Sequence, residues 1–543
     1  MWVAVTIAGW LGFVWFRLWQ ATQAPTLVWQ DSKSYEGVAG NALWSLHFWA
    51  GQRPPLVPLV WKLTGSESAF VLDQTLFAVV AWGLLAWVVA RSAPSGWRRT
   101  IAAGAVLAFA TSPPIVIWDR SVLSESLSLS LGALLFATAI PVARRPTPWR
   151  VAALAVTAVL IALTRDSQVW TVGLLGISFA AVAIFHFVRR RRLPRYSGSL
   201  ALAFLLVAGV AAWGVLDSGR TRANVTDVMF ARVFPFPDRV AWFAAHGMPE
   251  RSEIDRLAKT EPTTKGLAKT VAFDGRDPKF ARLKHWIDGD GQSTYYVWLS
   301  THPLYVVSEP LHRPERAFNN AHGNVYNYGG PKRVDSPVGQ VLWPGWVWLI
   351  PMFAVGLAAW LGEAGSETSW RRELHVVAVL GGVGVLAMLV AWHGDGQETT
   401  RHTIEGFAEL RLAILVLLVI AVAGQHVALP KRGQALIARI QTAARAERML
   451  GDLEKAWRRD RDTAERARGA SPEELERLVQ GRVDDAVSHL RARHRAVDSE
   501  DGSSAVRRDP TGFHEVLADE AEFRARVERR AERFYRRFRG RVR

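Results

Sequence analysis

The chain has 543 residues, 50% of them hydrophobic, and a formal net charge of +17. It contains no cysteine, which excludes disulfide bonds and thiolate metal sites. The basic residues lie beside apolar runs and in the C-terminal segment, a pattern that argues against a nucleic-acid-binding protein.

The first element is an apolar run, MWVAVTIAGWLGFVWFRLW, which is long enough to cross a hydrocarbon core of about 30 Å as a helix. A cleaved signal peptide is the alternative, but the run lacks a basic segment in front and ATQA is a poor cleavage site. Similar runs recur near residues 69–90, 101–118, 123–143, 151–164, 169–188, 199–216, 341–361, 374–392 and 407–428. Together they predict an all-α polytopic membrane protein with about ten spans.

The first loop, residues 21–68, places charged residues among tryptophans in WQDSKSYEGVAGNALW. Its apolar residues recur among polar ones, which predicts short helices that lie in the membrane interface. Asp31 in this stretch has two interpretations: a functional carboxylate, or the N-cap of a helix that begins around Ser32.

The connections between the predicted spans alternate in charge. RSAPSGWRR, ARRPTPWR, RRRRLPR and SWRR are rich in arginine, whereas DRSVLSES and TRDSQ are not. By the positive-inside rule, the arginine-rich connections are on the cytoplasmic side of a plasma membrane. The first loop, the segment 217–340 and the loop HGDGQETTRHTIEG then face outward.

This topology predicts four parts. Residues 1–216 form an N-terminal transmembrane core, and 217–340, with aromatic clusters and Gly/Pro breaks, form a largely helical extracytoplasmic module. Residues 341–428 supply the C-terminal spans, and 429–543 form a cytoplasmic tail of solvated helices. The end of the tail, with Phe534, Tyr535 and Phe538, either docks on the anionic inner leaflet or is a solvated charged face.

Ionisable residues gather on the predicted outer side of the spans. Such residues are costly at a membrane edge unless they pair or line a cavity, so they are functional candidates. Asp119 with Arg120, and Arg165 with Asp166, have the simpler interpretation of local pairs at helix ends. The four clusters are Asp31, Lys33 and Glu36; Asp119, Arg120 and Glu125; Arg165 and Asp166; and Glu398, Arg401 and His402.

Glu125 shares one side of a predicted helix with Ser121, Ser124 and Ser128, as a packing face or a cavity-lining face requires. His402 beside an arginine is typical of a hydrogen-bonded loop residue more than of a metal ligand, and no His/Asp spacing predicts a metal site. Arginines at the outer edge exceed the carboxylates that local pairing would supply, which indicates a phosphate ligand.

Carboxylates and arginines on one side suit the transfer of a sugar from a lipid-phosphate donor. A carboxylate takes the proton of the acceptor hydroxyl, and cations stabilise the phosphate that leaves. The hydrophobic chain of such a donor explains an enzyme embedded in the membrane, because the chain enters sideways between helices.

Four short motifs carry a family resemblance: DSKSYEGVA, LSESLSLSL, LTRDSQVW and ETTRHTIEGFAELRL. With these motifs the chain resembles the C-type (GT-C fold) integral-membrane glycosyltransferases that use polyprenyl-phosphate sugars, such as protein mannosyltransferases and bacterial arabinosyl- and aminoarabinosyltransferases. The resemblance covers roughly residues 1–220 and 390–428. The first loop departs from some mannosyltransferases because it lacks their adjacent acidic pair.

The resemblance implies a role for each candidate residue. Asp31 would be the general base, and Glu125 a second catalytic acid that positions the acceptor or the donor. The donor phosphate would bind to Arg165, Arg401, His402 and Arg120, and the substrates would be positioned by Tyr35, Lys33, Asp166 and Glu398.

The resemblance also implies a GT-C-like bundle, an inverting reaction and an acceptor that is an envelope glycan, a glycolipid or a protein. The expected partners are this donor, this acceptor and membrane lipids, without nucleic acid; no cofactor is certain, and a divalent metal is possible. A lipid or sugar-lipid transporter is the alternative, which predicts charges at mid-membrane and repeated halves. A non-catalytic envelope scaffold is a third reading and needs no pocket.

The topology can be tested because the chain contains no cysteine. With Ser293→Cys in the 217–340 module and Ser471→Cys in the tail, we expect an impermeant thiol reagent to label only Ser293→Cys in intact cells, and both variants after lysis. Labelling of Ser471→Cys in intact cells would show that the predicted orientation is wrong.

Overall fold

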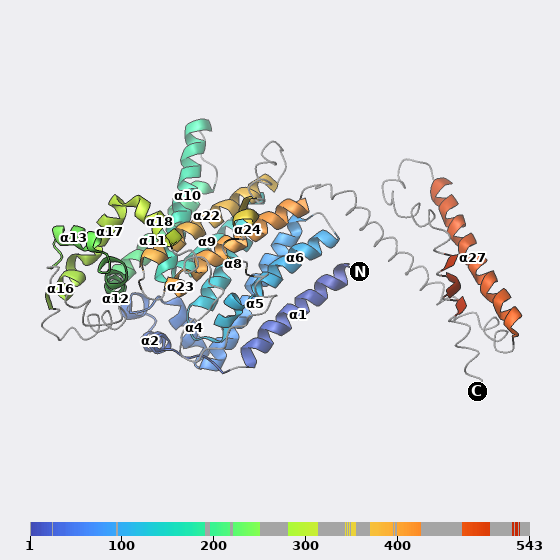
Figure 1. Cartoon of the computed structure of the whole chain (residues 1–543), viewed down its shortest axis with the longest axis horizontal. Helices are drawn as coiled ribbons and strands as arrows, with labels where there is room; N and C mark the ends of the chain where they lie inside the picture. The colour runs from blue at the N-terminus through green and yellow to red at the C-terminus, as the bar shows by residue number, and fades with distance from the viewer. Residues whose placement is uncertain are drawn as a thin grey trace. The chain divides into compact units, whose positions relative to one another are not determined.

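The structure is a computed structural model, and its described part is mostly helical (Figure 1). Within that part the only β pairing is an isolated bridge between Leu27 and Ser121. The chain divides into two compact units, Met1–His426 and Val427–Arg543. The structure describes residues 2–23, 25–93, 96–190, 196–217, 221–249, 281–312, 370–394, 399–424 and 470–499, with short stretches within 343–354, at 396 and within 524–532.

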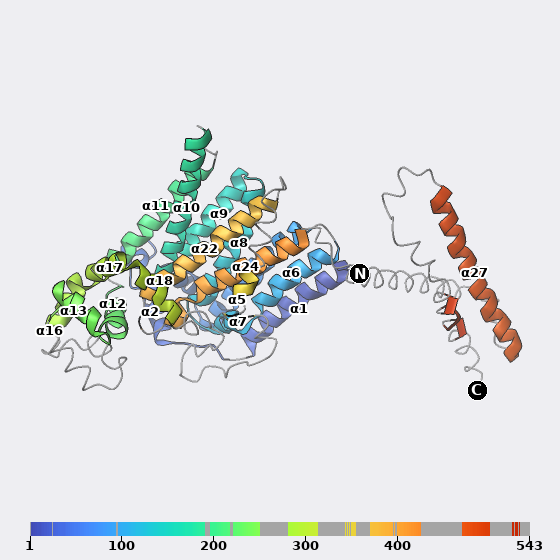
Figure 2. The same ribbon diagram turned by 45° about the horizontal axis from the view of Figure 1, so that its top comes forward.

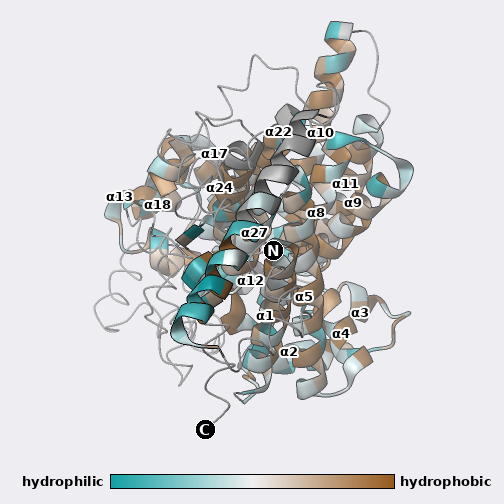
Figure 3. Cartoon of the chain, turned by 90° about the vertical axis from the view of Figure 1, so that its right-hand side faces the viewer, coloured by the Kyte–Doolittle hydropathy of each residue, from teal (hydrophilic) through white to brown (hydrophobic). Residues whose placement is uncertain are grey.

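Six described helices are long and apolar enough to cross a membrane, as in a multi-pass membrane protein. Brown, the colour of hydrophobic residues, is common on the visible parts of these helices in Figure 3, for example on α5. A helix pair, α6 (Trp97–Ala110) followed by Pro113–Arg120, gives a seventh span if its 54° bend is accepted. The six are α1 (Trp2–Thr22), α5 (Glu67–Ser92), α8 (Glu125–Arg144), α10 (Asp166–Arg190), α11 (Ser197–Asp217) and α22 (Trp370–Gly394).

The sequence predicts about ten spans, and the differences have local causes. The run at 101–118 is broken between α6 and α7 (Pro113–Val116), where two prolines start a new helix after Ser112. The run at 151–164 is the 15-residue helix α9 (Pro148–Ala162), which is short for a span. The run at 407–428 lies as far as Gly424 in the apolar helix α24 (Ile404–Gly424), and its remainder and most of 341–361 fall outside the described residues.

Helices α10 and α11 pack side by side, as do α22 and α24 (Figures 1 and 2). Glycines permit the second contact, because a Cβ at Gly384 would lie 2.9 Å from Glu409 Cβ, and one at Gly406 would lie 2.5 Å from the Gly384 carbonyl oxygen. Small residues at such positions let helix backbones approach closely in membranes. The side chains that begin α24 therefore lie directly against α22.

The first loop folds into the expected short helices, α2 (Gln30–Ala39), α3 (Leu46–Trp49) and α4 (Leu56–Thr64). The N-cap of α2 is Trp29, so the interpretation of Asp31 as the N-cap is wrong. The hydroxyl of Ser32 satisfies the backbone N–H of Trp29 instead, at 2.9 Å. The Leu27 N–H donates to the Arg120 carbonyl oxygen, and the Val122 N–H donates to the Leu27 carbonyl oxygen. These two backbone hydrogen bonds attach the first loop to the segment just before α8.

The described part of the 217–340 module is helical, with its own apolar core of residues between Val225 and Trp298. Glu309 attaches this module to the last turn of α22, because its carboxylate accepts a hydrogen bond from Trp392 Nε1 at 2.6 Å. The same carboxylate accepts from Arg232 NH1, within the module, at 2.9 Å. The helical segments are α12 (Thr221–Val228), η2 (Met229–Val233), α13 (Pro237–Ala245), α16 (Ala281–Trp286), η4 (Ile287–Gly291), α17 (Gln292–Thr301) and α18 (Pro303–His312).

The second unit contains α27 (Pro472–Ser499), a helix of the polar kind that the sequence predicts for the tail. Its start is a capping box, in which the Ser471 hydroxyl accepts from the Glu474 N–H at 3.2 Å and the Glu474 carboxylate accepts from the Ser471 N–H at 2.9 Å. Phe534, Tyr535 and Phe538 lie outside the described residues.

A buried ion pair joins α1 to the bent helix pair. Arg17 Nε lies 2.8 Å from Asp119 Oδ2, with both side chains almost inaccessible, and Arg17 also donates to the Ala110 carbonyl oxygen at 2.7 Å. Ser126 donates to Asp119 at 2.8 Å. Asp119 therefore pairs with a residue 102 positions earlier, and the simpler interpretation, a pair with Arg120, is wrong.

This pair should dominate the packing of α1. Arg17→Met leaves a buried carboxylate without its cation, which typically lowers the free energy of unfolding by about 3–5 kcal/mol. We expect a clearly lower thermal midpoint in detergent micelles, and a smaller loss when Asp119→Leu is added. Lys33→Ala, on an exposed side chain, should leave the midpoint nearly unchanged; an equal loss in this control would contradict the role of the pair.

Candidate functional site

Five elements bring charged residues to one end of the helical bundle, here called the site end. They are the first turn of α2, the start of α8, the turn between α9 and α10, the short helix α23 (Thr399–His402) and the first turns of α24. The ion pairs at this end join residues as far apart in the sequence as Asp31 and Arg401. The sequence predicts that four clusters of ionisable residues lie on one side of the spans. The members of these clusters that are described below do lie together at this end.

Glu125 is the centre of the site. Its side chain is completely buried, and its Oε1 accepts from Arg401 Nε and lies 3.3 Å from Arg165 NH1. Its position in the first turn of α8 adds the favourable field of a helix N-terminus. Its Oε2 has no hydrogen-bond partner among the described residues. One carboxylate thus holds two arginines that come from different parts of the chain.

Asp31 is the partly accessible member of the site, with 27% of its side chain exposed. Its Oδ2 accepts from Arg401 NH1 at 2.8 Å, and its Oδ1 accepts from Arg53 NH2 at 2.5 Å. Arg401 therefore bridges Asp31 and the buried Glu125. Arginine–carboxylate contacts of this kind are the strong ones among hydrogen bonds, so both carboxylates are held in fixed positions.

Arg165 lies on the other side of Glu125. Its NH1 donates to Glu405, in the first turn of α24, and its NH2 lies 3.2 Å from His402 Nδ1. Burial by itself lowers the pKa of Arg165, but the carboxylates of Glu405 and Glu125 outweigh it, so the pKa is raised. The simpler interpretation, a local pair with Asp166, is wrong, because the carboxylates that pair with Arg165 come from distant parts of the chain.

Tyr35 closes the site from α2. Its ring is 3% exposed and lies under the guanidinium group of Arg53, whose Cζ is 5.2 Å from the ring centroid. The phenol donates to Ser124 Oγ at 3.3 Å. Burial raises the pKa of Tyr35, so the phenol stays neutral near pH 7 and acts as a hydrogen-bond donor.

The remaining predicted site residues are placed differently. Lys33 and Glu36 are exposed on α2, and Asp31 has arginines as its partners. Arg120 is half-buried and contributes its backbone carbonyl to the first loop. Asp166 is half-buried at the start of α10, and Glu398 lies outside the described residues.

Two residues of the site were not predicted. Arg53 stands in GQRPP, where the two prolines precede α4 and end the preceding irregular segment. Glu405 lies in the first turn of α24, and its partner Arg165 is 240 positions away, so no local pattern in the sequence indicates this pair. Within the described residues, no group of three or more His, Asp or Glu side chains has the arrangement of a metal site.

No protein-family model matches the chain, and no curated protein matches it significantly. The chemistry of the site is therefore argued from its geometry. Three carboxylates, those of Asp31, Glu125 and Glu405, alternate with three arginines, Arg53, Arg165 and Arg401. Such an arrangement can hold one accessible carboxylate next to cationic donors.

Glu125 should be the residue on which the site depends most. Glu125→Gln removes the charge that Arg165 and Arg401 share and leaves two buried cations close together, a change worth about 3–5 kcal/mol of destabilisation. The measurement is the thermal midpoint of the purified protein, with Glu36→Gln on the exposed face of α2 as the matched control. Equal midpoints for the two variants would mean that Glu125 does not organise this end of the bundle.

Proposed function

We propose that this protein is a membrane glycosyltransferase. It would move a sugar from a polyprenyl-phosphate donor to an envelope glycan, glycolipid or protein acceptor on the outer face of the plasma membrane. The observation that supports this proposal is the bridge through Arg401, which joins the partly exposed carboxylate of Asp31 to the buried carboxylate of Glu125. A base and cations then lie side by side at the end of a membrane helical bundle.

Asp31 is the proposed general base. A base must reach the hydroxyl proton that it accepts, and the side chain of Asp31 is 27% exposed whereas that of Glu125 is fully buried. Because it is buried, Glu125 is here a positioning residue that contacts Arg401 and Arg165, in place of the second catalytic acid that the resemblance implies. Tyr35 and Arg53 fix the orientation of α2 and of the Asp31 carboxylate.

Arg401 and Arg165 are the proposed partners of the donor phosphate. Both guanidinium groups contact the same oxygen of Glu125, so the expected proximity of the two arginines is present. A guanidinium carries five N–H donors in a planar fork, more than its contacts with carboxylates require, and this geometry matches phosphate oxygens. His402, 3.2 Å from Arg165, stands next to the same position.

The proposed reaction is a single displacement. The acceptor oxygen forms a bond to the anomeric carbon while the bond from that carbon to the phosphate oxygen breaks, and the lipid phosphate leaves with the electron pair. The acceptor proton passes to Asp31, and the negative charge that develops on the phosphate is stabilised by the arginines. Attack from the face opposite the phosphate inverts the anomeric centre.

A lipid or sugar-lipid transporter remains the second candidate, because α24 carries two buried ionisable residues beyond its first turn, Glu409 and Arg411. Ionisable residues at membrane depth are typical of transport pathways. The transferase and the transporter can be distinguished by whether free lipid phosphate is formed. A transferase separates the sugar from its lipid phosphate, whereas a transporter moves the intact molecule.

Asp31→Asn is the direct test of the transferase. The amide keeps the shape of the side chain but does not accept the proton, so we expect turnover to fall by roughly two orders of magnitude or more while donor binding is retained. The measurement is release of free polyprenyl phosphate from a panel of pentosyl and hexosyl donors by purified protein. Glu36→Gln, on the exposed side of the same helix, is the control. Near wild-type turnover in Asp31→Asn would remove Asp31 as the base, and no release by the wild-type protein with any donor would favour the transporter.

A further inference from the structure

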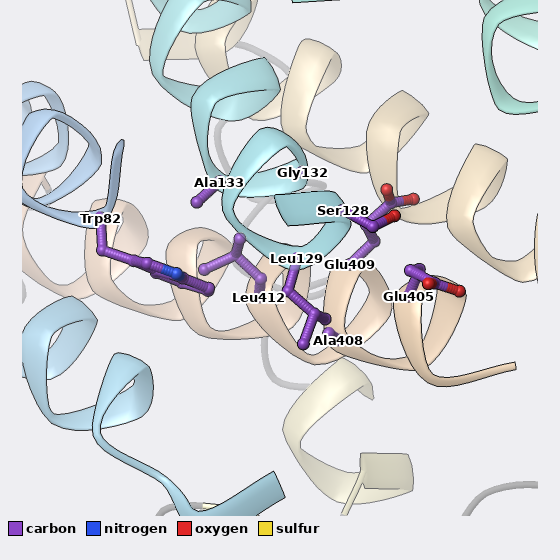
Figure 4. Close-up of a pocket in the computed structure, with 9 residues that line it drawn as sticks. All are labelled: Trp82, Ser128, Leu129, Gly132, Ala133, Glu405, Ala408, Glu409 and Leu412. Atoms are coloured by element: carbon purple, nitrogen blue, oxygen red, sulfur yellow. The ribbon is translucent and has the colours of Figure 1, made fainter. Parts of the chain in front are cut away.

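A narrow cavity of about 10 Å³ lies inside the bundle and is bordered by Glu405 (Figure 4). This volume is close to what one ordered water requires. Glu405 therefore belongs both to the site described above and to this cavity. The lining comes from α5, α8 and α24: Trp82, Ser128, Leu129, Gly132, Ala133, Glu405, Ala408, Glu409 and Leu412.

Glu409 is enclosed between two glycines of neighbouring helices. A Cβ at Gly132 of α8 would lie 3.4 Å from Glu409 Oε1, and a Cβ at Gly384 of α22 would lie 3.2 Å from Glu409 Oε2. The residue is 5% exposed, and no hydrogen bond or ion pair reaches it within the described part of the chain. The absence of side chains at both glycines thus leaves room for a carboxyl group in the bundle.

Ser128 supplies a second, independent polar group. Its residue is 4% exposed, and its hydroxyl oxygen has no hydrogen-bond partner among the described residues. Figure 4 shows its side chain beside that of Glu409 in the cavity. A buried hydroxyl without a partner costs free energy, and a ligand in the cavity would remove that cost.

Among the residues that the structure describes, no cation lies beside Glu409 to compensate its charge. Glu405, one helical turn earlier, has the same sign, and its partner Arg165 is at the site. Arg411 is two residues further on, a spacing at which helical side chains point apart, and its guanidinium lies over the ring of Trp343 at 4.5 Å. The cavity lining from α5 and α8 contains no lysine, arginine or histidine. A lone carboxylate in such surroundings is costly, so this position favours uptake of one positive charge.

We propose that Glu409 and Ser128 form a buried binding site for one small monovalent cation, a proton or a sodium ion. A proton would bind to a carboxylate oxygen of Glu409. A sodium ion would take oxygen ligands from Glu409 and Ser128, with Glu405 at the edge of the same cavity. The proposal does not rest on the transfer reaction, because Glu409 and Ser128 have no proposed role in it; Glu405, which pairs with Arg165, is the one residue that borders both sites.

The test uses dicyclohexylcarbodiimide, an apolar reagent that converts a protonated carboxyl group in membranes to an N-acylurea. Labelling is carried out on the whole protein in liposomes across a pH series, and the adduct is located by mass spectrometry of peptides. We expect an adduct at Glu409 that is lost as the pH rises and absent in Glu409→Gln. The exposed Glu36 should instead react with a water-soluble carbodiimide.

Sodium chloride then separates the two cations at constant ionic strength. Labelling that sodium slows, but potassium does not, identifies a sodium site, and Ser128→Ala should lose that protection. Labelling that is indifferent to sodium identifies a proton site. No adduct at Glu409 in the wild-type protein at any pH would overturn the proposal, whatever the outcome of the transfer assay.

Discussion

The burial of Glu125 is the constraint on which the site end of this bundle depends. A carboxylate withdrawn from water needs cations close to it, and the two that serve Glu125 come from the turn before α10 and from α23. These arginines also form ion pairs with two further carboxylates, Arg401 with Asp31 and Arg165 with Glu405. The first loop, three bundle helices and α23 are therefore positioned by a single set of charge contacts. Such a set fixes geometry more than it adds stability, because desolvation offsets much of the attraction.

Hydropathy was sufficient to predict the helical class and most of the long helices, since apolar runs are a local property of the sequence. Residue type and edge position also selected Asp31, Glu125, Arg165 and Arg401, which lie in one network. The partners were less predictable. Arg17 and Arg53 look like ordinary polar residues of a span end and a loop, and their carboxylates lie 102 and 22 positions away. Pairing across such separations depends on how helices pack, which no local pattern records.

The close contact of α22 and α24 joins the 217–340 module to the site end of the bundle. Glycines at positions 384 and 406 remove the side chains that would separate these helices, so their relative position is fixed by backbone contact. The last turn of α22 contacts the module, because Trp392 donates to Glu309 and His393 Nε2 lies 2.9 Å from the Val306 carbonyl oxygen, while the first turn of α24 carries Glu405 of the site. The module and the site are thus both attached to this closely packed helix pair.

The equal numbers of carboxylates and arginines at the site, three of each, affect how fast charged ligands associate with it. A site whose charges cancel produces little field beyond a Debye length, which is about 8 Å at physiological ionic strength. It therefore does not draw anions from bulk solution, unlike the strongly basic clefts that steer soluble phosphates. The lipid donor that we propose would diffuse within the membrane and reach Arg401 and Arg165 without electrostatic guidance. Discrimination against abundant soluble phosphates would follow from this neutrality, before any contact with the site.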